Sequence, residues 1–154
     1  MAEGRHCRRQ GATFHDRFCR NAVDIRPATI VGRLYQLPAG FPAVVIPEAS
    51  ILAHGTRDPL ADACTQAAFA ARGVTMAEVE GDWDTVHGEL ITFPDARRDL
   101  LPIDRLEGFR PDGRGLYRRA LVAARSEGGV GPAWVYHMTD GSRGRLLKGG
   151  SWEG

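Results

Sequence analysis

Two carboxylates stand three residues apart in the stretch IDRLEGF, residues 103–109. Glu107 follows a leucine and precedes a Gly-Phe pair. A carboxyl beside apolar side chains loses hydration, so its pKa rises and it can exchange a proton near neutral pH. Asp104, one helical turn earlier, fits a cap or an exposed helix charge. The residues alone leave two interpretations of Glu107, a surface charge at a helix end or a general acid/base.

Other residue types capable of chemistry predict little. His6, Cys7, His15 and Cys19 are of the kinds that bind zinc, but their spacing matches no standard finger, so we predict no metal site. The arginines of residues 1–26 could contact phosphates. Because the formal net charge of the whole chain is only +1, we expect a solvated basic arm and no nucleic-acid partner. The chain has no phosphate-binding glycine loop and no G-x-S-x-G elbow.

Three cysteines at irregular spacing are no disulfide framework, so we expect reduced thiols in a cytoplasmic protein. The N-terminus lacks the apolar segment of a secretory signal, and no apolar run is long enough to span a bilayer. We therefore expect no membrane partner. The sequence does not indicate an oligomeric state.

The elements that must position Glu107 follow from the hydrophobic pattern. The length of 154 residues, with 43% hydrophobic and 25% charged, indicates one domain with a substantial core. Asp58, Pro59 and Gly73 are typical of the cap, first position and stop of a helix. We also expect a short turn of helix in TMAEVEGD, residues 75–82, and two short turns in 95–108. Strands are predicted over 28–37, 43–47, 84–93, 115–126 and 132–138, with a tight turn at 127–131. Hairpin connections favour an α+β fold with a mostly antiparallel sheet or small barrel.

Five segments in order carry a family resemblance. They are ATIVGRLYQLPAGFPAVVIPE, VHGELITF, LLPIDRLEGF, LYRRALVAA and AWVYHM. Together they resemble the gamma-glutamylcyclotransferase-like family, also called AIG2-like, from about residue 28 to 138 and on to the GGSW near the end. The resemblance implies a small mixed, mostly antiparallel β-barrel with flanking helices around a pocket. It also implies an enzyme without metal or organic cofactor that cyclises a small-molecule gamma-glutamyl amine or peptide to 5-oxoproline.

The resemblance assigns roles to five residues. Glu107 matches the acid/base of the family's D-x-x-E-G segment. Tyr117 and Arg119 match its Y-x-R strand and are expected to bind substrate. Gly32 and Gly88 match its strand glycines, for which ligand contact and close packing at a barrel bend are alternative interpretations. A single carboxyl could deprotonate the attacking ammonium and then protonate the leaving nitrogen.

The N-terminus departs from the family pattern. Members begin with an apolar strand and a Y-G-S/T-L loop, where this chain reads AEGRHCRRQG. We therefore divide the chain into a basic arm, 1–26, and a family domain, 27–154, with a helical insertion at 49–82. The departure leaves open an incomplete site, a gap filled by another segment or chain, or a start that lies upstream. It also leaves open a non-catalytic ligand-binding or interaction protein on the same barrel, and more weakly a partner-binding role of the basic arm.

Overall fold

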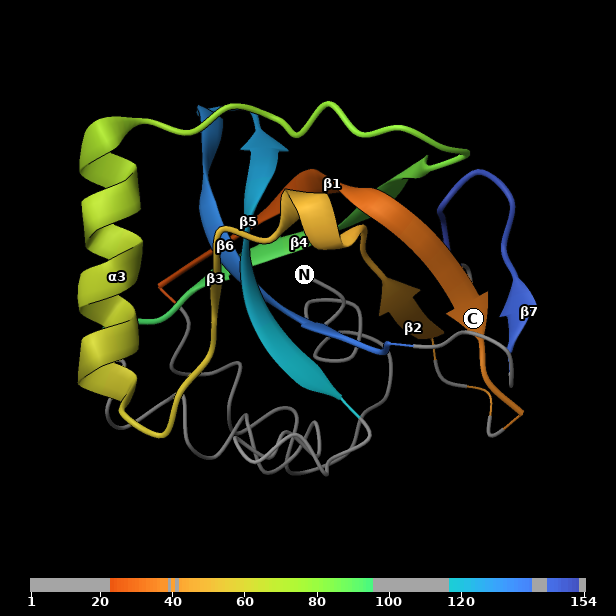
Figure 1. Cartoon of the computed structure of the whole chain (residues 1–154), viewed down its shortest axis with the longest axis horizontal. Helices are drawn as coiled ribbons and strands as arrows, with labels where there is room; N and C mark the ends of the chain where they lie inside the picture. Colours follow the sequence, from red (N-terminus) through yellow and green to blue (C-terminus); the bar gives the residue numbers. More distant parts are fainter. Residues whose placement is uncertain (1–22, 39, 41, 96–116, 140–143, 153–154) are drawn as a thin grey trace.

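The computed structural model describes residues 23–38, 40, 42–95, 117–139 and 144–152. These residues form an antiparallel sheet, one α-helix and one turn of 3-10 helix (Figure 1). In the described ranges, neither helix is long and apolar enough to cross a membrane. The elements are β1 (Asp24–Gln36), β2 (Pro42–Val45), η1 (Glu48–Ser50), β3 (Ala53–His54), α3 (Pro59–Arg72), β4 (Asp84–Thr92), β5 (Arg118–Ser126), β6 (Gly129–His137) and β7 (Arg145–Leu146).

The long strand β1 organises the sheet because different parts of it pair with four partners. Its first nine residues pair with β4, and its last four pair with β2. It also makes short pairings with β5 and β7. β5 pairs with β3 and β6 as well, and every pairing is antiparallel. In Figure 1, β2 and β7 lie on the side of the molecule away from α3.

β1 changes partner at Gly32, which pairs with the first residue of β4, whereas the next residue already pairs with Val45 of β2. A Cβ atom at Gly32 would lie 2.9 Å from the backbone oxygen of Val45 and 3.3 Å from a methyl of Val86. Real Cβ atoms essentially never come within 3.0 Å of such an atom, so the contact with Val45 excludes a Cβ unless the backbone moves. Glycine therefore lets β2 and β4 come together at the change of partner, so close packing, one of the two interpretations of Gly32, accounts for this position, and ligand contact stays a prediction.

The main cluster of buried apolar residues lies on one face of the sheet. Alternate residues of β1, β5 and β6 fill it, since successive side chains of a strand point to opposite faces. Trp152, close to the C-terminus, is also part of this cluster. The buried apolar residues of the cluster are Ala28, Ile30, Leu34, Val44, Ile46, Val86, Ala120, Val122, Ala124, Ala133, Val135 and Trp152.

The helix α3 forms as the sequence predicts. The Asp58 side chain accepts hydrogen bonds from the N–H groups of Leu60 and Ala61, and Gly73 ends the helix with a positive φ of 79°. Its burial is unusual, because the one buried residue of α3 is the charged Asp62. The Gln66 side chain adds a hydrogen bond to the carbonyl of Pro132 on β6. The helix thus docks on the sheet without a continuous apolar stripe.

Several predicted boundaries are wrong. β1 begins at Asp24, so the strand extends into the predicted basic arm. The turn predicted over 127–131 is shorter, because Ser126 pairs with Gly129 and β6 begins there. No helix forms over 75–82.

The predicted barrel is not confirmed by the described residues. Only β1 and β5 have partners on both edges, while each other described strand pairs with one strand, so the sheet does not close on itself. The antiparallel sheet with one described helix does confirm the coarser α+β prediction. The turns expected in 95–108 lie almost entirely outside the described residues.

Replacing Gly32 with alanine tests the role of this glycine in packing. The Gly32→Ala protein should lose about 1 to 3 kcal/mol of unfolding free energy, because the β2 backbone must move away from the new methyl group. Urea denaturation followed by circular dichroism measures the loss. Gly131→Ala is the matched control, since a Cβ at this β6 glycine meets nothing within 4 Å. Equal stability of the two variants would contradict the packing role.

Candidate functional site

The predicted acid/base Glu107 and its neighbour Asp104 lie in 96–116, outside the described residues. The described chain resumes at Tyr117, which is half-buried and comes immediately before β5. The assignment of Glu107 therefore stays a prediction. What the structure describes is the strand that follows this segment and the contacts that fix it.

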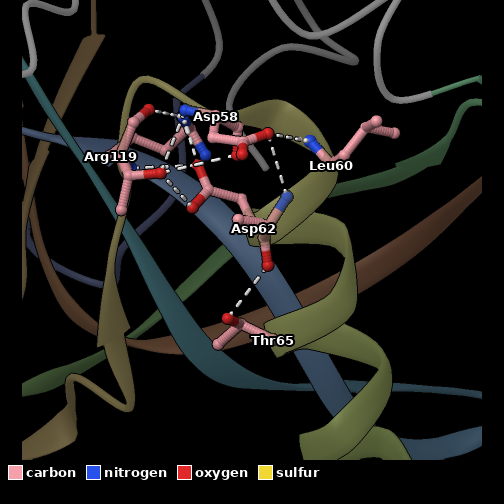
Figure 2. A network of polar contacts seen from close by, with 7 residues as sticks. Asp58, Leu60, Asp62, Thr65 and Arg119 are labelled. Atoms are coloured by element: carbon pink, nitrogen blue, oxygen red, sulfur yellow. Dashed lines mark hydrogen bonds and ion pairs between the residues drawn. The ribbon is translucent and has the colours of Figure 1, made fainter.

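Arg119 on β5 is held in a buried ion pair with Asp62 of α3. The Arg119 Nη2 donates to the Asp62 Oδ2 at 2.9 Å, and the two side chains are 0% and 3% exposed. The same Nη2 also donates to the backbone oxygen of Thr56 at 3.1 Å. Figure 2 shows these contacts converging where the N-terminal turn of α3 meets β5. A guanidinium and a carboxylate removed from water need this kind of partner, because desolvation of either alone costs several kcal/mol.

Thr56 completes the bonding of the Asp62 carboxylate. Its backbone N–H donates to Oδ2 at 2.9 Å, and its hydroxyl donates to Oδ1 at 2.8 Å. The guanidinium of Arg119 also lies over the Trp134 ring, with its Cζ 4.9 Å from the ring centroid. A buried carboxylate with three donors and a guanidinium on an aromatic face make a rigid junction between α3, β5 and β6.

The structure does not bring the predicted substrate-binding residues to one place. Arg119 contacts α3, whereas its neighbour Ala120 belongs to the core cluster, so Arg119 lies on the helix-covered face of β5. Gly32 and Gly88 share the opposite, core-side face, because Gly88 pairs with Ala28, four residues before Gly32. That separation along β1 is about 13 Å. Direct substrate binding by Arg119 and Tyr117 stays a prediction, and Arg119 has the structural role just described.

Gly88 lines a surface pocket of about 520 Å³ between β1, β4 and the β5–β6 hairpin. A ligand could therefore reach Gly88. Gly32, by contrast, has close backbone contacts. The other lining residues are Pro27, Ala28, Thr29, His87, Arg125, Ser126, Glu127 and Ser151.

His137 at the end of β6 is a buried titratable group that the sequence analysis did not single out. It is 5% exposed, and no described residue bonds to its Nε2. Burial lowers the pKa of His137 most, Arg118 and His54 lower it further, and the backbone of Met138 and the Glu48 carboxylate oppose this. His137 pairs with Arg118 and shares the face of Val135. The alternation along AWVYHM is the signal that could have placed it inward.

Metal ligands do not gather in the described part of the chain, where no group of three or more His, Cys, Asp or Glu side chains could hold an ion. His6, Cys7, His15 and Cys19 lie outside the described residues.

The role of Asp62 could not be predicted from the sequence, because nothing in an alanine-rich helix marks which polar position faces the sheet. The pocket around Gly88 was missed because it depends on residues of three strands.

A comparison with protein-family models matches residues 60–154 to the one described as gamma-glutamyl cyclotransferase, AIG2-like. The match covers more than half of the chain and includes the D-x-x-E-G segment and Tyr117. It begins inside α3, after β1, β2 and β3. No curated protein and no solved structure matches the chain.

Removing the Asp62 carboxylate should destabilise the protein strongly. The Asp62→Ala change leaves the Arg119 charge buried without its partner, which typically costs about 3 to 5 kcal/mol. Chemical denaturation measures this loss. Asp24→Ala is the control, because it breaks an ion pair with Arg26 of 2.6 Å whose side chains are 40% and 36% exposed, and exposed pairs contribute little.

A double substitution separates the ion pair from simple packing. Combining Asp62→Leu with Arg119→Met removes both charges, so the double variant should be more stable than Asp62→Ala alone. If Asp62→Ala is no more damaging than Asp24→Ala, the ion pair does not hold α3 on the sheet.

His137 should make stability depend on pH. Its folded-state pKa lies below the ordinary value of 6.5, so the unfolded chain binds more protons as pH falls through that value. Stability is therefore fully present above about pH 6.5 and is lost toward lower pH, at a rate of at most about 1.4 kcal/mol per pH unit. Urea midpoints between pH 5 and 8 measure this, and NMR titration of the imidazole gives the pKa directly.

His137→Gln should remove this part of the pH dependence, whereas His87→Gln, at an exposed position, should keep it. A folded-state pKa of 6.5 or above for His137 would contradict the prediction.

Proposed function

Because the chain belongs to the gamma-glutamyl cyclotransferase, AIG2-like family, we propose that it cyclises a small gamma-glutamyl amine or peptide to 5-oxoproline. The observation that carries the proposal is the family match, which spans the D-x-x-E-G segment and the strand after it. In this reaction the substrate's α-nitrogen bonds to its own γ-carbonyl carbon. The bond from that carbon to the leaving nitrogen then breaks.

Glu107 is the proposed acid/base. The α-ammonium loses two protons as it becomes the lactam N–H, and the leaving nitrogen gains two as it departs as an ammonium, so protons balance. Glu107 carries these protons in turn, and no cofactor is part of the proposal. The attack is intramolecular, so much of the advantage of proximity is already present in a folded-up substrate. Tyr117, half-buried at the end of the segment that contains Glu107, is the proposed ligand for a substrate carboxylate or carbonyl.

The buried junction supports this assignment of roles indirectly. Arg119 lies two residues after Tyr117, and its ion pair fixes the start of β5 against α3. A strand fixed at this point gives Tyr117 a defined position, as a substrate ligand needs. In the proposal Arg119 therefore serves the site by positioning β5, and its direct contact with substrate remains the further expectation drawn from the Y-x-R match.

A second candidate is a ligand-binding protein without catalysis on the same fold. Two observations favour it. The family match begins at residue 60, and the sequence before it reads AEGRHCRRQG where members carry Y-G-S/T-L. That loop would supply N–H donors to the developing oxyanion. Binding of gamma-glutamyl compounds without 5-oxoproline release would support this candidate.

The proposed function is tested by measuring 5-oxoproline release from a panel of gamma-glutamyl compounds. Glu107→Gln should keep the circular dichroism spectrum and lose at least about a hundredfold in rate, the usual contribution of a general acid/base. Tyr117→Phe should raise KM more than it lowers kcat, because it removes a binding hydroxyl.

Glu78→Gln is the control at an exposed glutamate and should behave as wild type. Full activity of the Glu107→Gln protein would exclude Glu107 as the acid/base, and an inactive wild type would exclude the enzyme.

A further inference from the structure

Three side chains with polar groups form a row across the sheet at the pocket beside Gly88. In the register of the strands, Thr29 of β1 pairs with His87 of β4 on one side and with Arg125 of β5 on the other. Directly paired residues of antiparallel strands point to the same face, with Cβ atoms about 5 Å apart. The neighbouring Ala28 belongs to the core, so the row lies on the face away from the core.

This row lies in the pocket of about 520 Å³, a size suited to a small molecule. Glu127, two residues after Arg125 at the hairpin turn, also lines the pocket, and so do Ser126 and Ser151. The pocket thus contains one guanidinium, one carboxylate, one imidazole and several hydroxyls.

The two charged groups of opposite sign are both available to a ligand. In the described part of the chain, neither Arg125 nor Glu127 makes a side-chain hydrogen bond or an ion pair, even with the other. Arg26 is within electrostatic range of Glu127 but is held by Asp24 at 2.6 Å. Opposite charges that line one pocket without pairing leave room for a ligand to bridge them.

We propose that this pocket binds the zwitterionic end of a small α-amino acid. The ligand carboxylate accepts hydrogen bonds from the Arg125 guanidinium, a geometry that arginine favours. The ligand ammonium donates to the Glu127 carboxylate, and the Thr29 hydroxyl, on the same face as Arg125, is placed to supply a further bond.

The charge balance of the pocket selects a zwitterion over a simple anion. A phosphate or a plain carboxylate on Arg125 would share the pocket with the Glu127 carboxylate, and like charges in one pocket repel. A plain amine on Glu127 would likewise be repelled by the Arg125 guanidinium. Only a ligand with both charges satisfies both side chains. The proposal does not rest on the cyclotransferase activity, since it invokes neither Glu107 nor turnover.

Titration of the full-length protein with L-alanine, followed by the NMR signals of its backbone amides, tests the proposal. Alanine should cause saturable shifts at residues 28–29, 87–88, 125–127 and 151. Propionate lacks the ammonium and ethylamine lacks the carboxylate, so each should bind at least about tenfold more weakly, as expected for loss of one charged hydrogen-bonding group. Inorganic phosphate should bind no better than propionate.

Two variants assign the groups. Arg125→Gln should weaken alanine binding at least about tenfold, whereas Arg57→Gln, at an exposed arginine outside the pocket, should leave it unchanged. Glu127→Gln should weaken alanine and bring its affinity close to that of propionate. Unchanged spectra in circular dichroism show that the variants are folded.

Three results would overturn the proposal. They are alanine shifts that do not saturate, binding of propionate or phosphate as tight as that of alanine, and an Arg125→Gln protein with wild-type affinity. The titration is repeated with the Glu107→Gln protein, in which alanine should bind as in the wild type. The outcome is therefore independent of the test for 5-oxoproline release.

Discussion

The buried pair of Arg119 and Asp62 is the interaction on which the arrangement of this protein depends. α3 presents no continuous apolar face to the sheet, and its one buried side chain is a carboxylate. Directional bonds hold the helix, from Arg119, from the backbone and hydroxyl of Thr56, and from Gln66 to β6. Such a junction is intolerant of the loss of one partner, because a lone buried charge is far more costly than a pair. It also fixes one register between helix and strand, since directional bonds do not permit the sliding that an apolar contact does.

Because of this junction, the two faces of β5 have different contacts. Ala120, Val122 and Ala124 pack in the core with β1 and β6, while the alternate residue Arg119 contacts α3. The start of the strand is thereby fixed from both sides, immediately after the segment that contains Glu107. Farther along, Arg125 lies in the row with Thr29 and His87, in a pocket open to solvent. One strand thus contributes to the core, to the docking of the helix and to a surface pocket, because its two faces are covered differently along its length.

Much of the fold could be predicted, because local rules decide it. The cap at Asp58, the stop at Gly73 and the strands around residues 30, 88, 121 and 134 follow from propensity, alternation and turn chemistry. The errors arose where pairing overrides local signals. The glycines of EGGVG predict a long turn, yet Gly129 and Gly131 are drawn into β6 by pairing with β5. Pro27 and the charged residues before it do not prevent β1 from starting at Asp24, because β4 pairs with them.

By itself, the sequence determined the five longer strands and the capped helix α3, in order, and the family, because these depend on residues close together in the chain or on short motifs in order. Only the tertiary structure decided which polar groups meet. Asp62 and Arg119 are 57 residues apart in the chain, and Thr29, His87 and Arg125 come from three strands. No periodicity encodes such meetings, since they follow from register and from the docking of a helix. Arg119 is an example: the sequence marks it as a residue of the Y-x-R motif, and only the docking of α3 shows that it forms a buried ion pair with Asp62.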